Sequence, residues 1–241
     1  MELREPPIGQ RFQQETKHAR PTYLSRSPER AAEEVSSRRI SLPPPSLETG
    51  PNLWKVLQKR RSIRDYSSHP LTLQELSSLL WATQGVTEKA FAPLYRTAPS
   101  AGALHPIDTY LIVNRAEGLE PGIYFLEVAD FSLAIRKRGD FSGPVARAAL
   151  DQDIAYAAAV VFVWVAVIRR SRQKYRQRAY RYIYLDCGHI GQNLYLAATA
   201  MNLGCCGIAA FFDDEVNDLV GIDGREETAI YLATVGKKEE G

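Results

Sequence analysis

Positions 159–168 carry the sequence AVVFVWVAVI, in which every residue is apolar. A strand with one face in water alternates apolar and polar residues, whereas this run offers apolar side chains to both faces. Its many valines also favour a strand over a helix. We therefore predict a central strand that lies deep in a sheet and is covered on both sides.

Further strands are predicted before and after this run. Thr109–Val113 is rich in β-branched and aromatic residues, and Gly122–Val128 followed by Ser132–Arg136 has the pattern of a hairpin. Ala229–Val235 is expected to be the last strand. We find no internal repeat in the chain.

Capping residues and apolar spacing indicate the helices. Thr72 and Glu75 have the spacing of a capping box, which predicts a helix over Leu73–Thr83. Small and apolar residues recur at helical spacing through Asp186–Leu203, as expected of a helix in a core or a dimer interface. Asp213–Leu219 is predicted to be a short helix.

Composition limits the class of protein. The chain has 241 residues, 45% of them hydrophobic, and its net charge of +2 is too small to favour nucleic acid by bulk electrostatics. No apolar run reaches the roughly 18 residues of a membrane helix, and no signal peptide is visible. Cys187, Cys205 and Cys206 lack the spacing of a disulfide framework or a zinc site, so we expect a cytoplasmic protein without a metal centre.

Residues 1–50 differ from the rest in their many prolines and charges and their few consecutive apolar residues. We interpret this segment as an extended, Pro-rich N-terminal arm that is either disordered or wrapped around a partner subunit. The globular domain is placed at residues 51–241.

Positive charge crowds around one hydroxyl after the amphipathic stretch Leu53–Leu57. The residues concerned are Arg60, Arg61, Ser62 and Arg64. Like charges spaced i,i+4 on a helix cost about 0.2–0.5 kcal/mol, whereas a guanidinium bonded to a phosphate contributes roughly 1.5–3 kcal/mol. A bound anion would therefore make the crowding favourable. The competing interpretation is a solvated basic turn with Asp65 as its only local acid.

Two small-residue segments are suited to contact with a planar ring. Thr97–Pro106 offers small side chains and free amides, although an ordinary tight loop explains the same composition. Leu203–Phe211 is expected to be a loop in which a helix ends in glycines and the chain presents consecutive amides. We interpret its two cysteines as packing residues, and His105 alone indicates nothing catalytic.

Five motifs in this order resemble the nitroreductase superfamily, and closely its SagB/ThcOx-type dehydrogenase branch. The resemblance covers about Trp54 to Lys237. It rests on Arg60–Tyr66, Pro99–Pro106, Lys174-Tyr175 with Tyr180–Tyr182, Gly188–Leu194 and Gly204–Phe211. It implies an α+β, nitroreductase-like fold with a central, mainly antiparallel sheet flanked by helices. It also implies a homodimer with FMN in two pockets at the subunit interface.

The resemblance assigns the cofactor-binding residues as well. They are Arg60, Arg61, Ser62 and Arg64 with Lys237 or Lys238 around the phosphate and ribityl chain, Pro99, Ser100, Ala101 and Gly102 reaching the ring from the partner chain, and Gly207, Ile208, Ala209 and Ala210 beside the ring edge. A main-chain amide near Ala209 would donate to the flavin N5, where hydride arrives. Related proteins often carry glycine or an acid at positions 209 and 210, but a backbone donor survives such a change.

Lys174 and Tyr175 match a pair that removes a proton in azoline-oxidising members of the branch, while the flavin N5 accepts hydride. A lysine acts as a base only in its neutral form, which neighbouring cations such as Arg172, Arg176 and Arg178 would favour. The alternative is a solvated basic helix face, since residues 169–181 carry many cations.

The leading prediction is an FMN-dependent oxidoreductase of the dehydrogenase or nitroreductase type, with NAD(P)H as a candidate electron donor. Its substrate could be a peptide azoline, a nitroaromatic, a quinone or another compound, because fold and cofactor do not determine substrate. One alternative is a nucleic-acid or acidic-peptide binder that uses the basic and aromatic residues 169–182. Near-neutral charge and the lack of a recognised module count against nucleic acid. The other alternative is a redox-inactive flavin-binding dimer.

Overall fold

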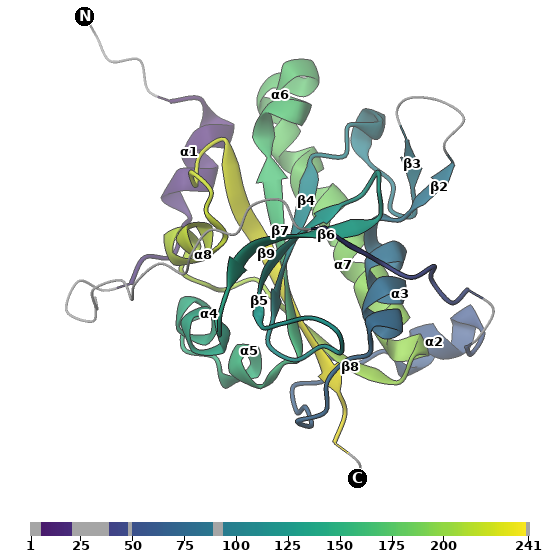
Figure 1. Ribbon diagram of the computed structural model, residues 1–241. Coiled ribbons are helices and arrows are strands. Elements are labelled where there is room, and N and C mark those ends of the chain that lie inside the picture. The colour runs from purple at the N-terminus through teal and green to yellow at the C-terminus, as the bar shows by residue number, and fades with distance from the viewer. Residues whose placement is uncertain (1–5, 21–38, 48–49, 89–93, 240–241) are drawn as a thin grey trace, which may run out of the picture.

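The computed structural model describes residues 6–20, 39–47, 50–88 and 94–239. Within them, the main sheet has seven strands in the order β1-β6-β5-β4-β7-β9-β8, and every neighbouring pair is antiparallel. Helices cover both faces of the sheet (Figure 1). The predicted α+β class, with an antiparallel sheet flanked by helices, is therefore confirmed.

The described elements are as follows. The main sheet contains β1 (Arg39–Ser41), β4 (Ile107–Val113), β5 (Gly122–Glu127), β6 (Ser132–Arg138), β7 (Val160–Val167), β8 (Leu203–Ile208) and β9 (Glu227–Lys237). A small separate hairpin joins β2 (Val86–Glu88) and β3 (Tyr95–Arg96). The helices are α1 (Ile8–Glu15), α2 (Leu53–Lys59), α3 (Leu73–Gln84), α4 (Ser142–Ala148), α5 (Asp153–Ala157), α6 (Ile168–Tyr175), α7 (Ala179–Ala200) and α8 (Asp213–Val220), with short 3-10 turns η2 (Ala101–Ala103) and η3 (Arg176–Arg178).

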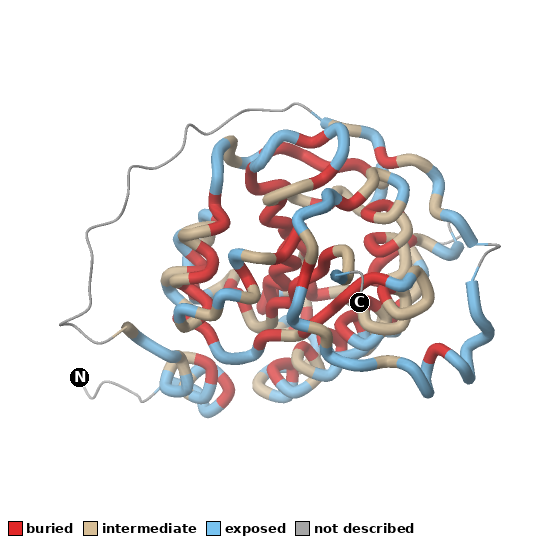
Figure 2. Tube along the Cα trace, turned by 90° about the horizontal axis from the view of Figure 1, so that it is seen from below, coloured by how far each residue is buried: buried red, intermediate tan, exposed pale blue. Residues whose placement is uncertain are grey.

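The predicted central strand is β7, which lies between β4 and β9 and is buried along its whole length. Phe162 and Trp164 point into the core under α3 and α7, whereas Val161 and Val163 point into the second core under α4, α5 and α8. Figure 2 shows the buried residues running through the middle of the molecule. The sheet thus needs apolar side chains on both faces, which is what the sequence of this strand provides.

The local signals in the sequence gave correct elements elsewhere too. β5 and β6 form the predicted hairpin, and β4 and β9 contain the predicted strands with extra residues at their ends. α3 begins with both halves of the capping box, since Glu75 N donates to Thr72 Oγ1 at 3.1 Å and Thr72 N donates to Glu75 Oε2 at 2.9 Å.

The long helix α7 corrects one predicted boundary. It begins at Ala179, well before the predicted start at Asp186, and ends at Ala200. Tyr180 and Ile183 are buried in the same helical series as the later apolar residues, so packing extends the helix backwards. The exposed Arg181 hides this continuation in the sequence.

The segment Leu203–Phe211 corrects a second expectation, because its first part is not a loop. Residues Leu203–Ile208 form the edge strand β8, whose one strand partner among the described residues is β9. Its glycines make room for aromatic rings, since a Cβ on Gly204 would lie 2.8 Å from the Tyr66 ring. In a strand, amides point alternately to either side, so only half of them face away from β9.

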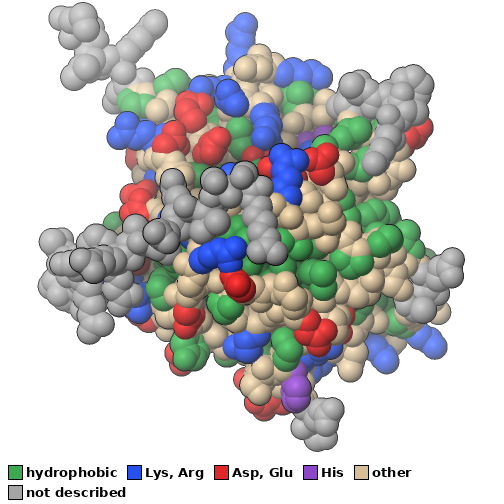
Figure 3. All heavy atoms as spheres, in the orientation of Figure 1, with side chains coloured by type: hydrophobic (Ala, Val, Ile, Leu, Met, Phe, Trp, Pro, Cys, Tyr) green, Lys and Arg blue, Asp and Glu red, His purple; other side chains and the backbone are tan. Residues whose placement is uncertain are grey.

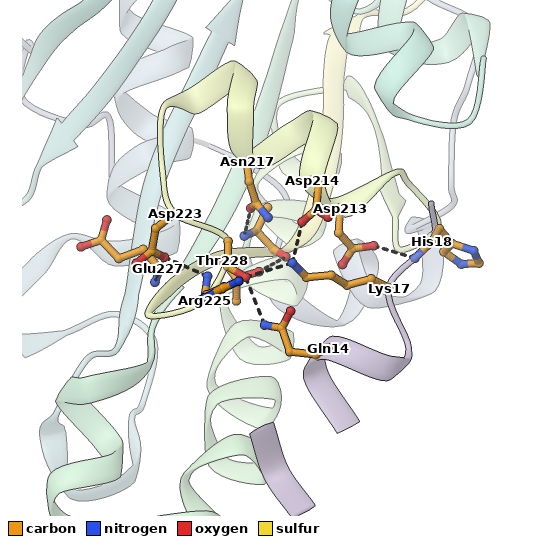
Figure 4. A network of polar contacts seen from close by, with 12 residues as sticks. Gln14, Lys17, His18, Asp213, Asp214, Asn217, Asp223, Arg225, Glu227 and Thr228 are labelled. Carbon is orange, nitrogen blue, oxygen red and sulfur yellow. Dashed lines mark hydrogen bonds and ion pairs between the residues drawn. The ribbon is translucent and has the colours of Figure 1, made fainter. Parts of the chain in front are cut away.

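Parts of the N-terminal segment pack on the domain instead of extending from it. Ile8–Glu15 is the helix α1, and Arg39–Ser41 pairs with β6 as strand β1. Lys17 Nζ lies 2.6 Å from Asp214 Oδ1, and Figure 4 shows the polar network around this contact. The expectation of an extended arm therefore fails for α1. Residues 1–5, 21–38 and 48–49 of the predicted arm lie outside the described residues.

Candidate functional site

The first candidate segment lies where α2 ends beside the outer edge of β8. Ile63 N donates to Cys205 O at 3.0 Å, which holds the residues after α2 along this edge. Ser62 Oγ lies 3.2 Å from the Tyr195 hydroxyl, and the Arg60 guanidinium carbon lies 5.3 Å from the centre of the Tyr195 ring. Arg60, Ser62 and Tyr195 therefore meet at one place, which we call the cradle.

Two cations of the cradle region carry uncompensated charge. Within the described residues, Arg60 and Arg64 form no ion pair, and neither does Asp65. The absence of an ion pair to Asp65 agrees with both interpretations, an open anion site and a solvated basic turn, and the assignment to an anion stays a prediction. The remaining charges can meet an anion.

The other two predicted cations are engaged elsewhere. Arg61 donates to Gln58 O at 3.1 Å and to Arg60 O at 2.8 Å, so it covers the last carbonyls of α2. The Lys237 ammonium pairs with the Glu75 carboxylate at the start of α3. In this single chain neither side chain is directed at Ser62, and their assignment to the cofactor stays a prediction.

Tyr195 joins the cradle to the third segment. The amide of Gly207 donates to the Tyr195 hydroxyl at 2.6 Å, while the same hydroxyl lies next to Ser62. Sequence reasoning missed this residue, because a tyrosine at helical spacing has no local signal that distinguishes it from a core residue. The contact also shows that the Gly207 amide points away from β9. Ala209 follows Gly207 by two residues and so has its amide on the same side if the chain continues extended.

A cavity of about 340 Å³ lies beside these groups, between α7 and β9. Its lining combines glycines with aromatic side chains, namely Tyr184, Cys187, Gly188, Gly191, Gln192, Tyr195, Ile230 and Tyr231. Burial raises the pKa of Tyr231 to about 12, so its hydroxyl stays protonated at neutral pH. The volume falls in the range of ligand sites, and the mixed lining suits a flat, partly polar ring.

The second candidate segment is held by a residue that the sequence did not single out. Asp186 on α7 accepts hydrogen bonds from Ser100 Oγ at 2.6 Å and from Ala101 N at 3.2 Å. Ser100 Oγ in turn accepts from His105 N at 2.9 Å. Burial raises the pKa of Asp186, and the hydrogen bonds from Ser100 and Ala101 oppose this effect.

Lys174 and Tyr175 lie against this second segment. Gly102 has φ of 65°, and a Cβ there would sit 2.5 Å from the Tyr175 hydroxyl and 2.8 Å from Lys174 Nζ. Only glycine permits this approach. Lys174 Nζ also lies 5.3 Å from the centre of the Tyr175 ring. The structure thus brings Ser100, Gly102 and the two predicted catalytic residues together, and we call Lys174 and Tyr175 the dyad.

The cations expected to influence Lys174 are not equivalent. Arg172 contacts both oxygens of the Glu226 carboxylate at 2.9 Å, which offsets its charge. Arg176 and Arg178 have no acidic partner in the part of the chain that the structure describes. Lys174 is exposed and likewise makes no ion pair with a described residue.

The cradle and the dyad lie on opposite faces of α7. Asp186, which holds the dyad side, and Tyr195, which belongs to the cradle, are nine residues apart in this helix. That spacing corresponds to about 14 Å along the axis and about half a turn around it. The helix itself therefore separates the two clusters within one chain. The three predicted segments do not converge on one ligand unless a second chain takes part.

The remaining sequence features have structural roles. Cys187, Cys205 and Cys206 are free and buried, and burial raises the pKa of the thiols of Cys187 and Cys205. The described residues contain no group of His, Cys, Asp and Glu side chains suited to hold a metal ion. None of the helices described combines the length and apolar character that crossing a membrane requires.

The chain belongs to the nitroreductase family, whose model matches residues 57–237. Among curated relatives, protein MJ1384 of Methanocaldococcus jannaschii, named for nitroreductase activity, is 37% identical over 188 residues, which cover 78% of this chain and 92% of the relative. The family recognised from the five motifs is therefore confirmed.

Three solved structures share the fold. A nitroreductase-family structure from Ralstonia eutropha JMP134 superposes with a TM-score of 0.74 at 24% identity and covers 90% of this chain and 98% of its own. The E. coli microcin synthetase McbBCD complex with truncated pro-MccB17 bound gives a TM-score of 0.65 at 18% identity, covering 100% of this chain and 85% of the other. A nitroreductase-family protein from Desulfovibrio desulfuricans in complex with FMN gives 0.56 at 16% identity, with 80% and 89% covered.

Proposed function

We propose that this chain is an FMN-dependent oxidoreductase that works as a homodimer in the cytoplasm. Each cofactor would be held by the cradle of one chain and completed by the second segment and the dyad of the other. The observation that carries this proposal is the separation of two complementary half-sites by α7, one with open cations and the other with a positioned lysine and tyrosine. In a two-fold symmetric dimer, the cradle face of each chain can meet the dyad face of the other, which would form two identical sites.

The residues of the cradle fit the proposed cofactor. Arg60 and Arg64 offer uncompensated charge for a phosphate, with Ser62 between them as a hydroxyl donor. Gly207 and Ala209 would present backbone at the ring edge beside the cavity. The FMN complex of the Desulfovibrio desulfuricans relative supports the choice of FMN. When bound, FMN supplies the acceptor and donor of hydride at its N5 atom.

The dyad favours dehydrogenation over simple reduction of an acceptor. A substrate that loses hydride from one carbon must lose a proton from a neighbouring atom, and Lys174 would be the base that takes that proton. Tyr175, in contact with Gly102, would orient the amine and the substrate. Reduction of a nitroaromatic or quinone needs no such base, and NAD(P)H would serve as electron donor in that case. Because dehydrogenation needs a base and acceptor reduction does not, we assign the chain to the SagB/ThcOx-type dehydrogenases.

A peptide is the substrate class that the comparisons favour. The fold of this chain matches one chain of the microcin synthetase complex, and truncated pro-MccB17 is bound in that complex. A heterocycle in a peptide chain offers adjacent carbon and proton sites of the kind that the dyad requires. An azoline within a peptide is therefore the substrate we propose.

The cofactor assignment is tested by charge reversal. Arg64→Glu is expected to lower FMN affinity by at least about 10-fold, since it replaces an attractive contact worth roughly 1.5–3 kcal/mol by a repulsive one. Bound FMN is measured from the visible spectrum of the purified protein. Lys59→Glu, at the end of α2, is the matched control and should retain FMN. Equal FMN content in both variants would contradict the cradle.

The catalytic assignment is tested separately on the loaded protein. Screening electron donors and acceptors should first find a pair that bleaches and restores the flavin colour. Lys174→Ala is then expected to keep FMN but slow oxidation of a substrate that must lose a proton, by about 10²- to 10⁴-fold. Full activity without the amine would reduce Lys174 to a surface charge. Yellow protein that no donor reduces would support the redox-inactive alternative.

A further inference from the structure

The basic stretch from residue 169 to 181 has a part that the proposed redox site does not use. Two of its cations are neutralised, because Arg170 pairs with Asp108 and Arg172 with Glu226. The others have no ion-pair partner among residues 6–20, 39–47, 50–88 and 94–239, namely Arg169, Lys174, Arg176, Arg178 and Arg181. Figure 3 shows Lys and Arg side chains gathered at the end of the molecule where α6 lies.

A groove of about 620 Å³ lies beside these cations, between α1 and the start of α7. Ile8, Phe12 and Leu185 line it with 78%, 55% and 55% of their surface exposed, respectively. Arg178 and Arg181 line the same groove. Large exposed apolar side chains next to uncompensated charge are unusual on a surface without a partner.

The groove is connected to the dyad by a row of stacked side chains. Arg178 lies 5.9 Å from the Tyr182 ring centre, the Tyr182 and Tyr175 rings are 4.8 Å apart, and Lys174 Nζ lies 5.3 Å from the Tyr175 ring centre. Arg178 and Lys174 are therefore no more than about 16 Å apart, a span that about five extended residues cover. A peptide held at Arg178 can reach Lys174.

We propose that this groove docks an acidic segment of a peptide substrate that also carries a large apolar side chain. Carboxylates would bond to Arg178 and Arg181, the apolar side chain would pack on Ile8, Phe12 and Leu185, and the reacting residue would follow within about five positions. This inference rests on the proposed function for its reacting site. The docking itself depends only on the groove.

A second copy of the chain fits the groove less well. The acidic run that begins α8 is already occupied, because Asp214 pairs with Lys17 and Glu215 with Arg20. Grooves facing each other across a two-fold axis would also bring arginines against arginines. Nucleic acid would use the cations and stack on Phe12, but it would leave the aliphatic side chains Ile8 and Leu185 of the same groove without an apolar partner.

Calorimetric titration of the full-length, FMN-loaded protein tests the docking. The probes are a short acetylated peptide that carries Asp and Leu residues, a matched peptide with Asn in place of every Asp, and one with Ser in place of every Leu. We expect each replacement to weaken binding by at least about 10-fold, and binding of the acidic peptide to weaken as salt is raised. Equal affinity for the Asp and Asn peptides would overturn the proposal.

Protein variants locate the binding surface. The double variant Arg178→Glu/Arg181→Glu is expected to weaken binding of the acidic peptide by at least about 10-fold. Arg169→Glu, an exposed cation of the same stretch outside the groove, should change it less than about 2-fold. Leu185→Ser should weaken the same peptide without changing its salt dependence. Equal losses in Arg169→Glu and the double variant would reduce the effect to bulk charge and overturn the proposal.

Three other measurements separate this inference from its rivals. FMN content should be unchanged in the groove variants, so failure of docking is distinguishable from failure of the cradle. If Leu185→Ser or Leu185→Asp converts a dimer into a monomer in size-exclusion chromatography, the groove is a self-interface and the docking proposal fails. Binding of a single-stranded oligonucleotide in place of the acidic peptide would overturn it as well.

Discussion

The two faces of α7 differ in how far their polar groups are satisfied. On the dyad face, Asp186 is buried and bonded to Ser100 and Ala101, and Gly102 touches Tyr175. On the cradle face, the guanidinium groups of Arg60 and Arg64 have no acidic partner in the described chain. On the dyad face the carboxylate of Asp186 is engaged while Lys174 makes no ion pair with a described residue, and on the cradle face both guanidinium groups are open. Under the proposed function, the cradle of one chain and the dyad of a second chain would form one site.

Mixed dimers give the largest expected effect. A dimer that combines one Arg64→Glu chain with one Lys174→Ala chain should bind about one FMN and recover about half of the wild-type turnover, because one of its sites has both an intact cradle and an intact dyad. Both parent homodimers should be nearly inactive. Chains with different affinity tags allow the mixed species to be purified.

The flavin spectrum provides a second readout of the same mixed dimer. If the halves come from different chains, the bound FMN should show the spectrum of the wild-type protein. If both halves belong to one chain, the FMN would show the spectrum of the Lys174→Ala homodimer and turnover would not recover. That result would contradict a site shared between two chains.

Gly102→Ala sharpens the role of the dyad face. The new Cβ would displace Tyr175 and Lys174, and we expect turnover to fall by about 10- to 100-fold. Gly118→Ala is the matched control, because Gly118 has a similar φ of 74° but nothing within 4 Å of its Cβ position. Both variants should lose about 1–2 kcal/mol of unfolding free energy from the left-handed backbone. An equal loss of turnover in both would contradict the contact.

Tyr195→Phe tests the cradle face by removing a single hydroxyl group. The variant leaves the Gly207 amide and Ser62 without the hydroxyl they contact. We expect FMN affinity to drop several-fold and the unfolding free energy to fall by about 1 kcal/mol. Tyr156→Phe, at a side chain that is 58% exposed, is the control and should change neither quantity. An unchanged dissociation constant for FMN would remove Tyr195 from the cradle.

His105→Asn gives the smallest effect and depends on pH. Burial, together with the charge of Arg96, lowers the pKa of His105 to about 4 from an ordinary value of 6.5. Between these values the unfolded chain binds a proton that the folded chain does not, so stability falls as pH drops from 6.5 to 4. The loss should be about 1–2 kcal/mol, since the ring is partly screened by solvent.

Denaturation at a series of pH values measures this loss. Asn tolerates the positive φ of 43° at position 105, so His105→Asn should fold and show a weaker pH dependence than the natural chain. His69→Asn changes an exposed histidine and should leave the dependence unaltered. If the unfolding free energy depends on pH in the same way in all three proteins, burial does not lower the pKa of His105 as expected.

Sequence patterns predicted the parts of the fold that depend on local signals. The all-apolar β7 and the capping box of α3 are examples, because burial on two faces and helix initiation each leave a trace within about ten residues. β8 was wrongly expected to be a loop, since Gly204 and Gly207 suggested turns. They are glycines because Tyr66 and Tyr231 lie against them, which only the folded chain reveals.

The site follows the same rule. Charge crowding at Arg60–Arg64 led to the cofactor prediction and the resemblance to the family led to the choice of Lys174 and Tyr175, and both assignments stay predictions. Asp186 and Tyr195 were missed because their contacts to Ser100 and Ser62 join residues 86 and 133 positions apart. Both residues lie within the predicted helix Asp186–Leu203, but which segments contact them is known only from the folded chain.

Segments that precede the core in the chain lie at both borders of the main sheet, where β1 is a three-residue edge strand. β1 covers β6, and Ile63 covers β8 through one hydrogen bond to Cys205. An uncovered strand edge is a template for pairing between molecules. The turn that carries Arg60, Ser62 and Arg64 therefore also occupies part of the open edge of β8, where a strand of another molecule would otherwise pair.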